Sequence, residues 1–76
     1  MKDLLIYIAQ NLVDKPDEVS VTEIEGPGET TYELRVAQSD MGKVIGRGGR
    51  IAKEIRALMK SVAQRQGKRI SVDIVD

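Results

Sequence analysis

The residues best suited to chemistry stand in one short stretch, residues 42–50, which reads Gly-Lys-Val-Ile-Gly-Arg-Gly-Gly-Arg. Gly46 and Gly49 are three residues apart, and because neither carries a Cβ, the backbone can come very close to another group there. A helix that begins just after them directs unpaired N–H groups and the positive end of its dipole at the same place. This combination favours an anion, and the natural anion is a phosphate. Arg47 and Arg50 add positive charge where that phosphate would sit.

The charges are segregated along the chain, although the formal net charge is zero. Residues 1–42 hold three basic and nine acidic side chains, whereas residues 43–69 hold nine basic and one acidic. A solvated helix surface is the simplest interpretation of a basic run. Because this run begins at a phosphate-type loop, it favours a nucleic-acid partner instead.

Several classes of function are disfavoured by composition. The chain has no Cys and no His, which removes disulfides, the usual zinc sites and every His-based catalytic triad. Residues 42–49 match neither the phosphate-loop nor the dinucleotide-binding glycine motif. We therefore expect no enzyme, no metal and no cofactor. Tyr7 and Tyr32 are the only aromatic residues, so base stacking on an aromatic platform is not expected to dominate binding.

The composition also indicates where in the cell the protein is expected. The longest apolar run, residues 4–9, is far too short for a membrane span, and the first residues lack the features of a signal peptide. A cysteine-free chain fits a reducing compartment. We expect a cytoplasmic protein with no membrane partner.

Hydrophobic periodicity predicts the elements that must position the glycine stretch. A helix over residues 2–14 is followed by strands over 19–24 and 31–36, joined around Gly26-Pro27-Gly28 by a loop of four to six residues. The first helix is expected to bury one face, and the second strand to point alternate residues inward. The expected buried positions are Leu4, Leu5, Ile8 and Leu12 on the helix, and Tyr32, Leu34 and Val36 on the strand. Ile6 and Val13 are expected to lie off the buried face of the helix.

The second half predicts a short helix over residues 40–45, capped by Ser39-Asp40, then the glycine loop and a long helix over 49–66. Gly67 should end that helix in a left-handed conformation. A last strand follows, with Ile70, Val72 and Ile74 alternating. The long helix is expected to bury a stripe made of Ile51, Ile55, Leu58 and Val62, and Ala52, Met59 and Ala63 should widen this stripe. Its basic residues Lys53, Arg56 and Lys60 should be largely turned away from it.

The predicted order is helix, strand, strand, short helix, Gly-x-x-Gly loop, helix, strand within a single domain, residues 1–76. Because a helical crossover precedes the last strand, that strand can pair in parallel with an earlier one. The expected fold is an α+β sandwich, with a three-stranded mixed sheet and helices packed on one of its faces.

Residues 44–55, Val-Ile-Gly-Arg-Gly-Gly-Arg-Ile-Ala-Lys-Glu-Ile, resemble the signature of KH domains. The element order resembles the type II KH arrangement, and nearly the whole chain is similar to the small bacterial single-KH proteins of the KhpA family. One position departs from the pattern: the apolar place three after Gly49 is Ala52, with Ile51 beside it.

The resemblance implies cytoplasmic binding of single-stranded RNA in a bacterium, as a post-transcriptional regulator or RNA chaperone. It also implies homodimers, and heterodimers with a KH protein of the KhpB (Jag-like) type. KH domains grip about four nucleotides at such a loop, and single-stranded DNA stays open as a ligand. The expected RNA-binding residues are Lys43, Val44, Ile45, Gly46, Arg47, Gly48, Gly49, Arg50, Ile51 and Lys53.

Within this set we expect backbone amides and Arg47 to meet the phosphate, and Val44, Ile45 and Ile51 to form an apolar floor under the bases. The alternative is a KH fold that has lost its clamp and serves only in dimerisation or protein interaction. Acidic residues between the two motif glycines would favour that alternative, and Arg47-Gly48 argues against it.

Overall fold

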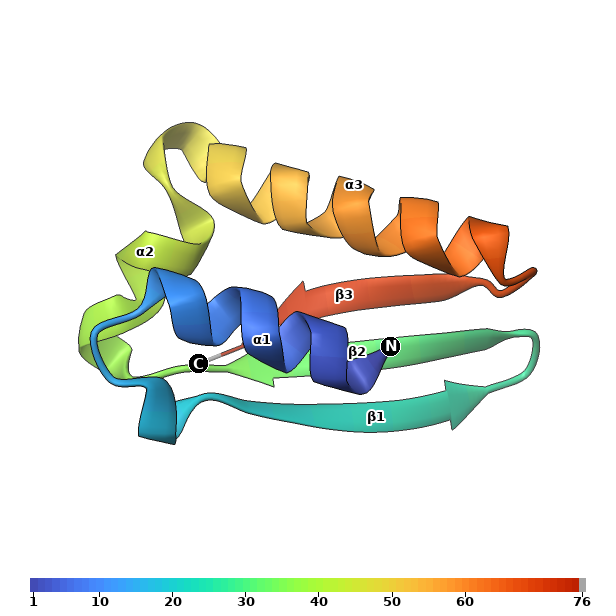
Figure 1. Ribbon diagram of the computed structural model, residues 1–76, viewed down its shortest axis with the longest axis horizontal. Helices are drawn as coiled ribbons and strands as arrows, with labels where there is room; N and C mark the ends of the chain where they lie inside the picture. Colours follow the sequence, from blue (N-terminus) through green and yellow to red (C-terminus); the bar gives the residue numbers. More distant parts are fainter. Residues whose placement is uncertain (76) are drawn as a thin grey trace.

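The elements follow one another in the predicted order. The computed structural model describes residues 1–75, in which three strands and three α-helices form the domain (Figure 1). Short 3-10 turns precede β1, α2 and α3, at Pro16–Glu18, Gln38–Asp40 and Arg47–Gly49. The main elements are α1 (Lys2–Leu12), β1 (Ser20–Gly26), β2 (Glu29–Arg35), α2 (Met41–Ile45), α3 (Arg50–Arg65) and β3 (Ile70–Ile74).

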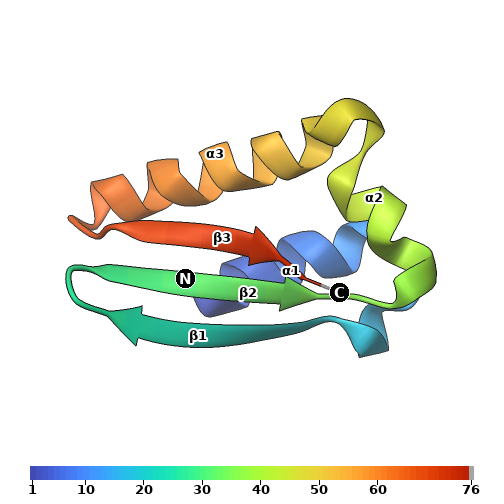
Figure 2. The same ribbon diagram turned by 180° about the vertical axis from the view of Figure 1, so that it is seen from behind.

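The sheet has the order β1-β2-β3 and is mixed, as expected. β1 pairs antiparallel with β2, with Val21 opposite Leu34, and β3 pairs parallel with β2, with Val72 opposite Tyr32. In Figure 1 helix α1 lies in front of the sheet, and in Figure 2, seen from behind, the strands lie in front and no helix covers them. The α+β sandwich with helices on one face is therefore confirmed.

The helices pack through faces that are rotated from the predicted ones. α1 buries Leu5 and Ala9 most deeply, and α3 buries Ala52, Ile55, Met59 and Ala63. Leu12 and Leu58, both predicted to be buried, are 37% and 49% exposed. The rotation arises because each helix packs against the sheet and a neighbouring helix at once, so that the contact face lies between two directions. Ile6 and Val13, predicted off the face, are partly buried against the core.

The end of α1 and the length of the hairpin loop differ most from the prediction. α1 ends at Leu12, two residues early, because Val13 is already extended at φ −103° and ψ 161°. The hairpin loop is also shorter than expected: Gly26 pairs with Glu29, so only Pro27 and Gly28 connect the strands. Gly28 has φ 78°, the left-handed value that the third position of a Pro-Gly type II turn requires.

Asp40 has a different role from the predicted helix cap. Its side chain makes no capping hydrogen bond to α2, and it is only 1% exposed. Its two carboxylate oxygens instead accept hydrogen bonds from the backbone N–H groups of Asp14 at 3.1 Å and Lys15 at 3.0 Å. The start of α2, and with it the loop beyond, is thereby tied to the segment that leaves α1.

The end of α3 agrees with the prediction. The helix ends at Arg65, and Gly67 adopts φ 68° while the amide of Lys68 bonds the carbonyl of Ala63 at 2.9 Å. None of the helices formed by residues 1–75 combines the length and the apolar character that crossing a membrane requires.

Candidate nucleic-acid interface

The loop between α2 and α3 owes its shape to three glycines. Gly46, Gly48 and Gly49 all have positive φ, at 76°, 63° and 77°. Gly46, with ψ 171°, lies in a region of backbone space that is essentially restricted to glycine. The chain can therefore leave α2 at Ile45, turn sharply and enter α3 at Arg50 within four residues.

Gly46 is also where the backbone approaches another group most closely. A Cβ on this residue would lie 2.7 Å from Cγ1 of Ile51 and 2.9 Å from the nitrogen of Ile51. At Gly48 and Gly49 a Cβ would meet no atom within 4 Å. These two positions call for glycine through their backbone conformation alone, and the outer surface of the loop stays open to a ligand.

The electrostatics of the loop are unusual for a helix start. Arg47, Arg50 and Lys53 cluster at the N-terminus of α3, where there is no acidic residue in the first turn and no side-chain cap. Within residues 1–75 none of the three forms a salt bridge. Cations at the positive end of a helix dipole reduce its stability, whereas an anion there is favoured. The arrangement fits a helix end that is completed by a bound anion.

The apolar residues of the predicted site divide into exposed and buried. Ile45 is 36% exposed, and Ile51 is half-buried beneath Gly46. Val44, by contrast, is completely buried, so its side chain offers no surface to a base and supports the loop from within the core. This corrects the expectation that Val44 forms part of the floor. A hollow of about 430 Å³ beside the loop is lined by Arg47, Arg50 and Ile51.

Lys43 is turned toward acidic residues. Its Nζ lies 3.2 Å from Oδ2 of Asp14 and 3.9 Å from Oδ1 of Asp40. It therefore balances the buried carboxylate of Asp40, unlike Arg47 and Arg50, which have no such partner. The positive charge that is available to a ligand starts at Arg47.

Arg56 is a residue whose position the sequence did not reveal. It was expected to turn largely away from the buried face of its helix, but it is half-buried and its Nε donates a hydrogen bond to the carbonyl of Val72 at 3.0 Å. β3 is an edge strand of the sheet, so Arg56 joins α3 to that edge. Lys53, Arg56 and Lys60 recur at helical spacing, so a basic stripe runs from the loop along the β3 side of α3. The spacing was visible in the sequence, whereas the contact with the strand was not.

Comparison with known proteins identifies close relatives of this chain. The KH-domain model of KhpA/KhpB matches residues 2–74. The RNA-binding protein KhpA of Chlamydia trachomatis serovar D is 49% identical over 76 residues, which are 100% of this chain and 97% of that protein. The RNA-binding protein KhpA of Clostridium acetobutylicum is 53% identical over 75 residues, 99% of this chain and 100% of that protein.

Solved structures of lower identity share the fold. Era from Aquifex aeolicus superposes on this chain with a TM-score of 0.69 at 19% identity. A structure of Era in complex with MgGDPNP and nucleotides 1506–1542 of 16S ribosomal RNA superposes with a TM-score of 0.66 at 18% identity. Each match covers 96% of this chain and 28% of the Era chain. The likeness therefore concerns one part of Era, and its fold alone.

Proposed function

The chain belongs to the KhpA/KhpB family of KH-domain proteins, and from this premise we propose that it binds single-stranded RNA by clamping the sugar–phosphate backbone at the loop from Gly46 to Gly49. The relatives are RNA-binding proteins, and one Era structure of the same fold was solved with ribosomal RNA. The expectation that the protein is not an enzyme agrees with a family of RNA-binding proteins.

The observation that carries the proposal is the group of unpaired cations at the positive end of α3. Arg47, Arg50 and Lys53 oppose the helix dipole and one another, and no acidic side chain among residues 1–75 forms a salt bridge with them. Such an arrangement reduces the stability of the free protein and is compensated when a phosphate binds. Local features that conflict with stability are characteristic of functional sites.

In the proposed mechanism the phosphate meets backbone amides of residues 46–49 and the guanidinium of Arg47. Arg50 and Lys53 add charge on the following turn, and about four nucleotides are held, as in KH domains generally. Ile45 and Ile51 provide apolar surface for the bases, while Val44 holds the loop from below. Lys43 contributes to binding only where RNA draws it away from Asp14.

The decisive experiment reverses the charge of the loop while leaving its glycines in place. Gly48 has φ 63°, so a substitution there would add strain, and the variant of choice is Arg47→Glu with Arg50→Glu. Fluorescence anisotropy with a labelled single-stranded RNA should show at least a ~10-fold loss of affinity, about 1.4 kcal/mol. The control Lys2→Glu with Lys15→Glu makes the same change in net charge at two exposed positions and should bind more tightly than the loop variant. Equal affinity of the folded loop variant and the wild type would favour the interaction-only alternative.

The same assay addresses the choice between RNA and DNA. Only RNA carries a 2′-hydroxyl, which can both donate and accept a hydrogen bond. We propose RNA as the ligand, so a DNA strand of the same sequence should bind more weakly. DNA binding of equal strength would show that backbone charge alone is recognised.

We propose further that the protein acts as a post-transcriptional regulator or RNA chaperone in the cytoplasm, as a homodimer or paired with a KhpB-type protein. The family model embraces both KhpA and KhpB, which supports the pairing. An exposed apolar groove of about 230 Å³ between α1 and α3 supports assembly; Ile8, Leu12, Ile51, Ile55 and Leu58 contribute its apolar lining. A small domain gains stability when such a surface is covered.

A further inference from the structure

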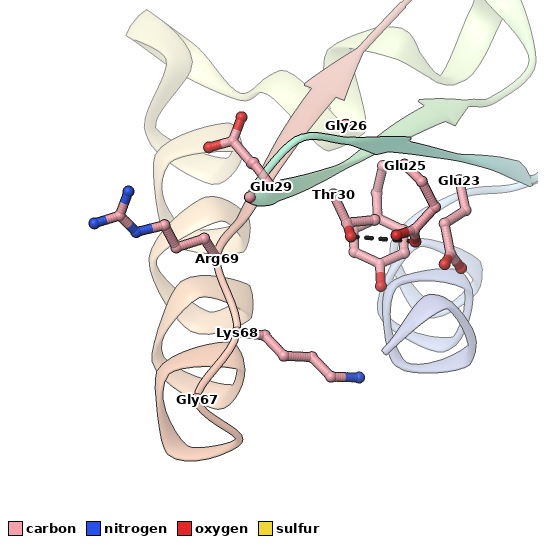
Figure 3. A pocket seen from close by; sticks show the side chains of 10 residues that line it. Glu23, Glu25, Gly26, Glu29, Thr30, Gly67, Lys68 and Arg69 are labelled. Atoms are coloured by element: carbon pink, nitrogen blue, oxygen red, sulfur yellow. Dashed lines mark hydrogen bonds between the residues drawn. The ribbon is translucent and has the colours of Figure 1, made fainter.

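A second hollow lies at the opposite end of α3 from the glycine loop. It has a volume of about 370 Å³ and lies between the β1–β2 hairpin and the turn that joins α3 to β3 (Figure 3). Its lining is mostly polar, unlike that of the groove between α1 and α3. The side chains that matter for its chemistry are Glu23, Glu25, Thr30, Tyr32, Lys68 and Arg69.

Tyr32 gives this hollow a hydroxyl that has no partner among the side chains and backbone of residues 1–75. The residue is only 4% exposed, yet its hydroxyl has no hydrogen-bond partner among residues 1–75. Among residues 1–75, every side-chain nitrogen or oxygen that is fully shielded from solvent has a hydrogen-bond partner. The hydroxyl must therefore open into the hollow that the residue lines. The hydroxyl is therefore free to bond a ligand in the hollow, as tyrosine hydroxyls of largely buried residues commonly do.

The hydroxyl stays protonated at neutral pH. Burial raises the pKa of Tyr32 above its ordinary value of 10.0, and the negative charges of Glu23 and Glu25 raise it further. The group that faces the hollow is thus a neutral O–H that can donate one hydrogen bond and accept another.

The charged groups of the hollow differ in how far they are already engaged. Glu25 accepts a hydrogen bond from Thr30 Oγ1 at 3.2 Å, whereas Glu23 and Glu29, which also lines the hollow, have no side-chain hydrogen bond or ion pair within residues 1–75. Lys68 and Arg69 are likewise unpaired. In Figure 3 Lys68 extends toward the side that carries Glu23 and Glu25, and Arg69 points the other way. A ligand on that side would therefore meet an acceptor-only group, a hydroxyl and the ammonium group of Lys68.

We propose that this hollow is a second nucleotide site, which takes a guanine base together with its phosphate. A carboxylate can only accept hydrogen bonds, so the group that faces Glu23 must donate. Guanine carries two N–H donors side by side, at N1 and N2, which match the two oxygens of one carboxylate. Its O6 lies next to N1 and can accept from the hydroxyl of Tyr32, while the ammonium group of Lys68 meets the phosphate.

The other bases fit less well. Adenine and cytosine place a ring acceptor beside their single exocyclic amine, and that acceptor would face the carboxylate. Uracil has one N–H between two carbonyls. Bases of single-stranded RNA are commonly read along these edges. The Glu23 carboxylate beside the Tyr32 hydroxyl therefore favours guanine over the other three bases.

This inference rests on the proposed function, because it extends the path of the same RNA. α3 has 16 residues and is about 24 Å long, so the hollow lies beyond the nucleotides held at the loop. Lys60 and Gln64 line a smaller hollow of about 230 Å³ that shares Lys68 and Arg69 with the larger one. Basic side chains thus accompany a strand from the loop to the guanine site.

The test isolates the hollow from the loop. The full chain carrying Arg47→Glu and Arg50→Glu is titrated with 5′-GMP, and separately with the AMP, CMP and UMP analogues, while backbone amide shifts are followed by NMR. Saturable shifts at Thr30, Tyr32 and Lys68 are expected with GMP, and binding of the other three should be weaker by at least about fivefold, the equivalent of one hydrogen bond. No saturable shift, or equal binding of all four nucleotides, would overturn the proposal.

Variants provide a second readout. Tyr32→Phe and Glu23→Gln should each weaken GMP binding by about fivefold or more, whereas Glu33→Gln, which removes a carboxylate from the opposite face of the sheet, should leave it unchanged. The hydroxyl of Tyr32 makes no hydrogen bond within residues 1–75, so Tyr32→Phe should keep the unfolding midpoint. Unaltered GMP binding in both variants would refute the assignment. Displacement of GMP by an arginine-rich peptide as the tighter ligand would point to a basic protein partner instead.

The outcome separates this inference from the proposed function. A wild-type protein that binds RNA through the loop but gives no GMP shifts at the hollow contradicts the second site alone. A loop variant that keeps full RNA affinity contradicts the loop clamp, whatever the GMP titration shows.

Discussion

Ile51 packs directly against the backbone of Gly46, so closely that a Cβ on Gly46 would lie 2.7 Å from Cγ1 of Ile51. The first turn of α3 thus rests on the turn that leaves α2. Contact between a glycine and an isoleucine, together with three positive φ angles, determines the shape of the loop. The cations at its surface are positioned by this packing.

The first prediction concerns this contact. Gly46→Ala should lower the free energy of unfolding by about 2–4 kcal/mol, because the added methyl group is overpacked against Ile51 and the backbone conformation disfavours alanine. Gly42→Ala is the matched control, since Gly42 lies within α2 and a Cβ there would meet nothing within 4 Å. It should stabilise the protein by about 0.5–1 kcal/mol. Urea unfolding of both variants checks the contrast, and similar midpoints would contradict it.

Asp40 should be important for folding. Asp40→Asn replaces one accepting oxygen with an NH₂ group, which would face the backbone N–H of Asp14 or of Lys15. We expect a loss of about 1–3 kcal/mol, because a buried donor is left without an acceptor. Asp17→Asn, at an exposed position, should change stability by less than about 0.5 kcal/mol. Chemical denaturation distinguishes the two, and an Asp40→Asn protein as stable as wild type would rule out this role.

RNA affinity should depend on salt. If the basic segment neutralises about three to five phosphates, the slope of log affinity against log salt concentration should be roughly −2 to −3.5 for a single strand. Anisotropy titrations at several salt concentrations measure it, and the Arg47→Glu, Arg50→Glu variant should give a shallower slope. A slope near zero in the wild type would mean that the basic segment is only a solvated surface.

Arg56 should stabilise the sheet edge. Arg56→Ala removes the donor to the carbonyl of Val72 and should cost about 1–2 kcal/mol, because that carbonyl is then left partly buried without a partner. Lys60→Ala, one turn further along the same stripe, removes an exposed charge and should have little effect on stability. Thermal unfolding compares them, and equal melting temperatures would show that the hydrogen bond contributes nothing.

Assembly should depend on the apolar groove between α1 and α3. Leu58 is 49% exposed there, so Leu58→Asn should weaken self-association without disturbing the core. Ile24→Asn is a suitable control, because Ile24 is 45% exposed on a strand of the sheet and does not line the groove. Sedimentation equilibrium should show a wild-type dimer at micromolar concentration. A wild type that stays at 8.4 kDa at all accessible concentrations would contradict the proposal.

Patterns within single elements were enough to predict much of this protein from its sequence. The alternation of Tyr32 and Leu34 placed both in the core. The Gly-x-x-Gly spacing placed a sharp turn before α3, and Gly67 placed its end. These predictions succeeded because each depends on local backbone chemistry: the side-chain period of a strand, and the freedom of glycine to take positive φ.

The features that failed or were missed all depend on neighbours distant in sequence. Leu12 and Leu58 are exposed because the rotation of α1 and α3 is set by how the helices pack on the sheet and on each other. The hydrophobic periodicity of each helix does not set it. Asp40 is a buried acceptor because the chain returns to Asp14 and Lys15 after 25 residues. The unpartnered hydroxyl of Tyr32 exists only where the hairpin meets the turn at Lys68. The inward positions of β2, the sharp glycine turn before α3 and the end of α3 are therefore local properties of this chain. Helix rotation, the roles of its buried polar groups and its second hollow arise from tertiary packing, which brings distant residues together.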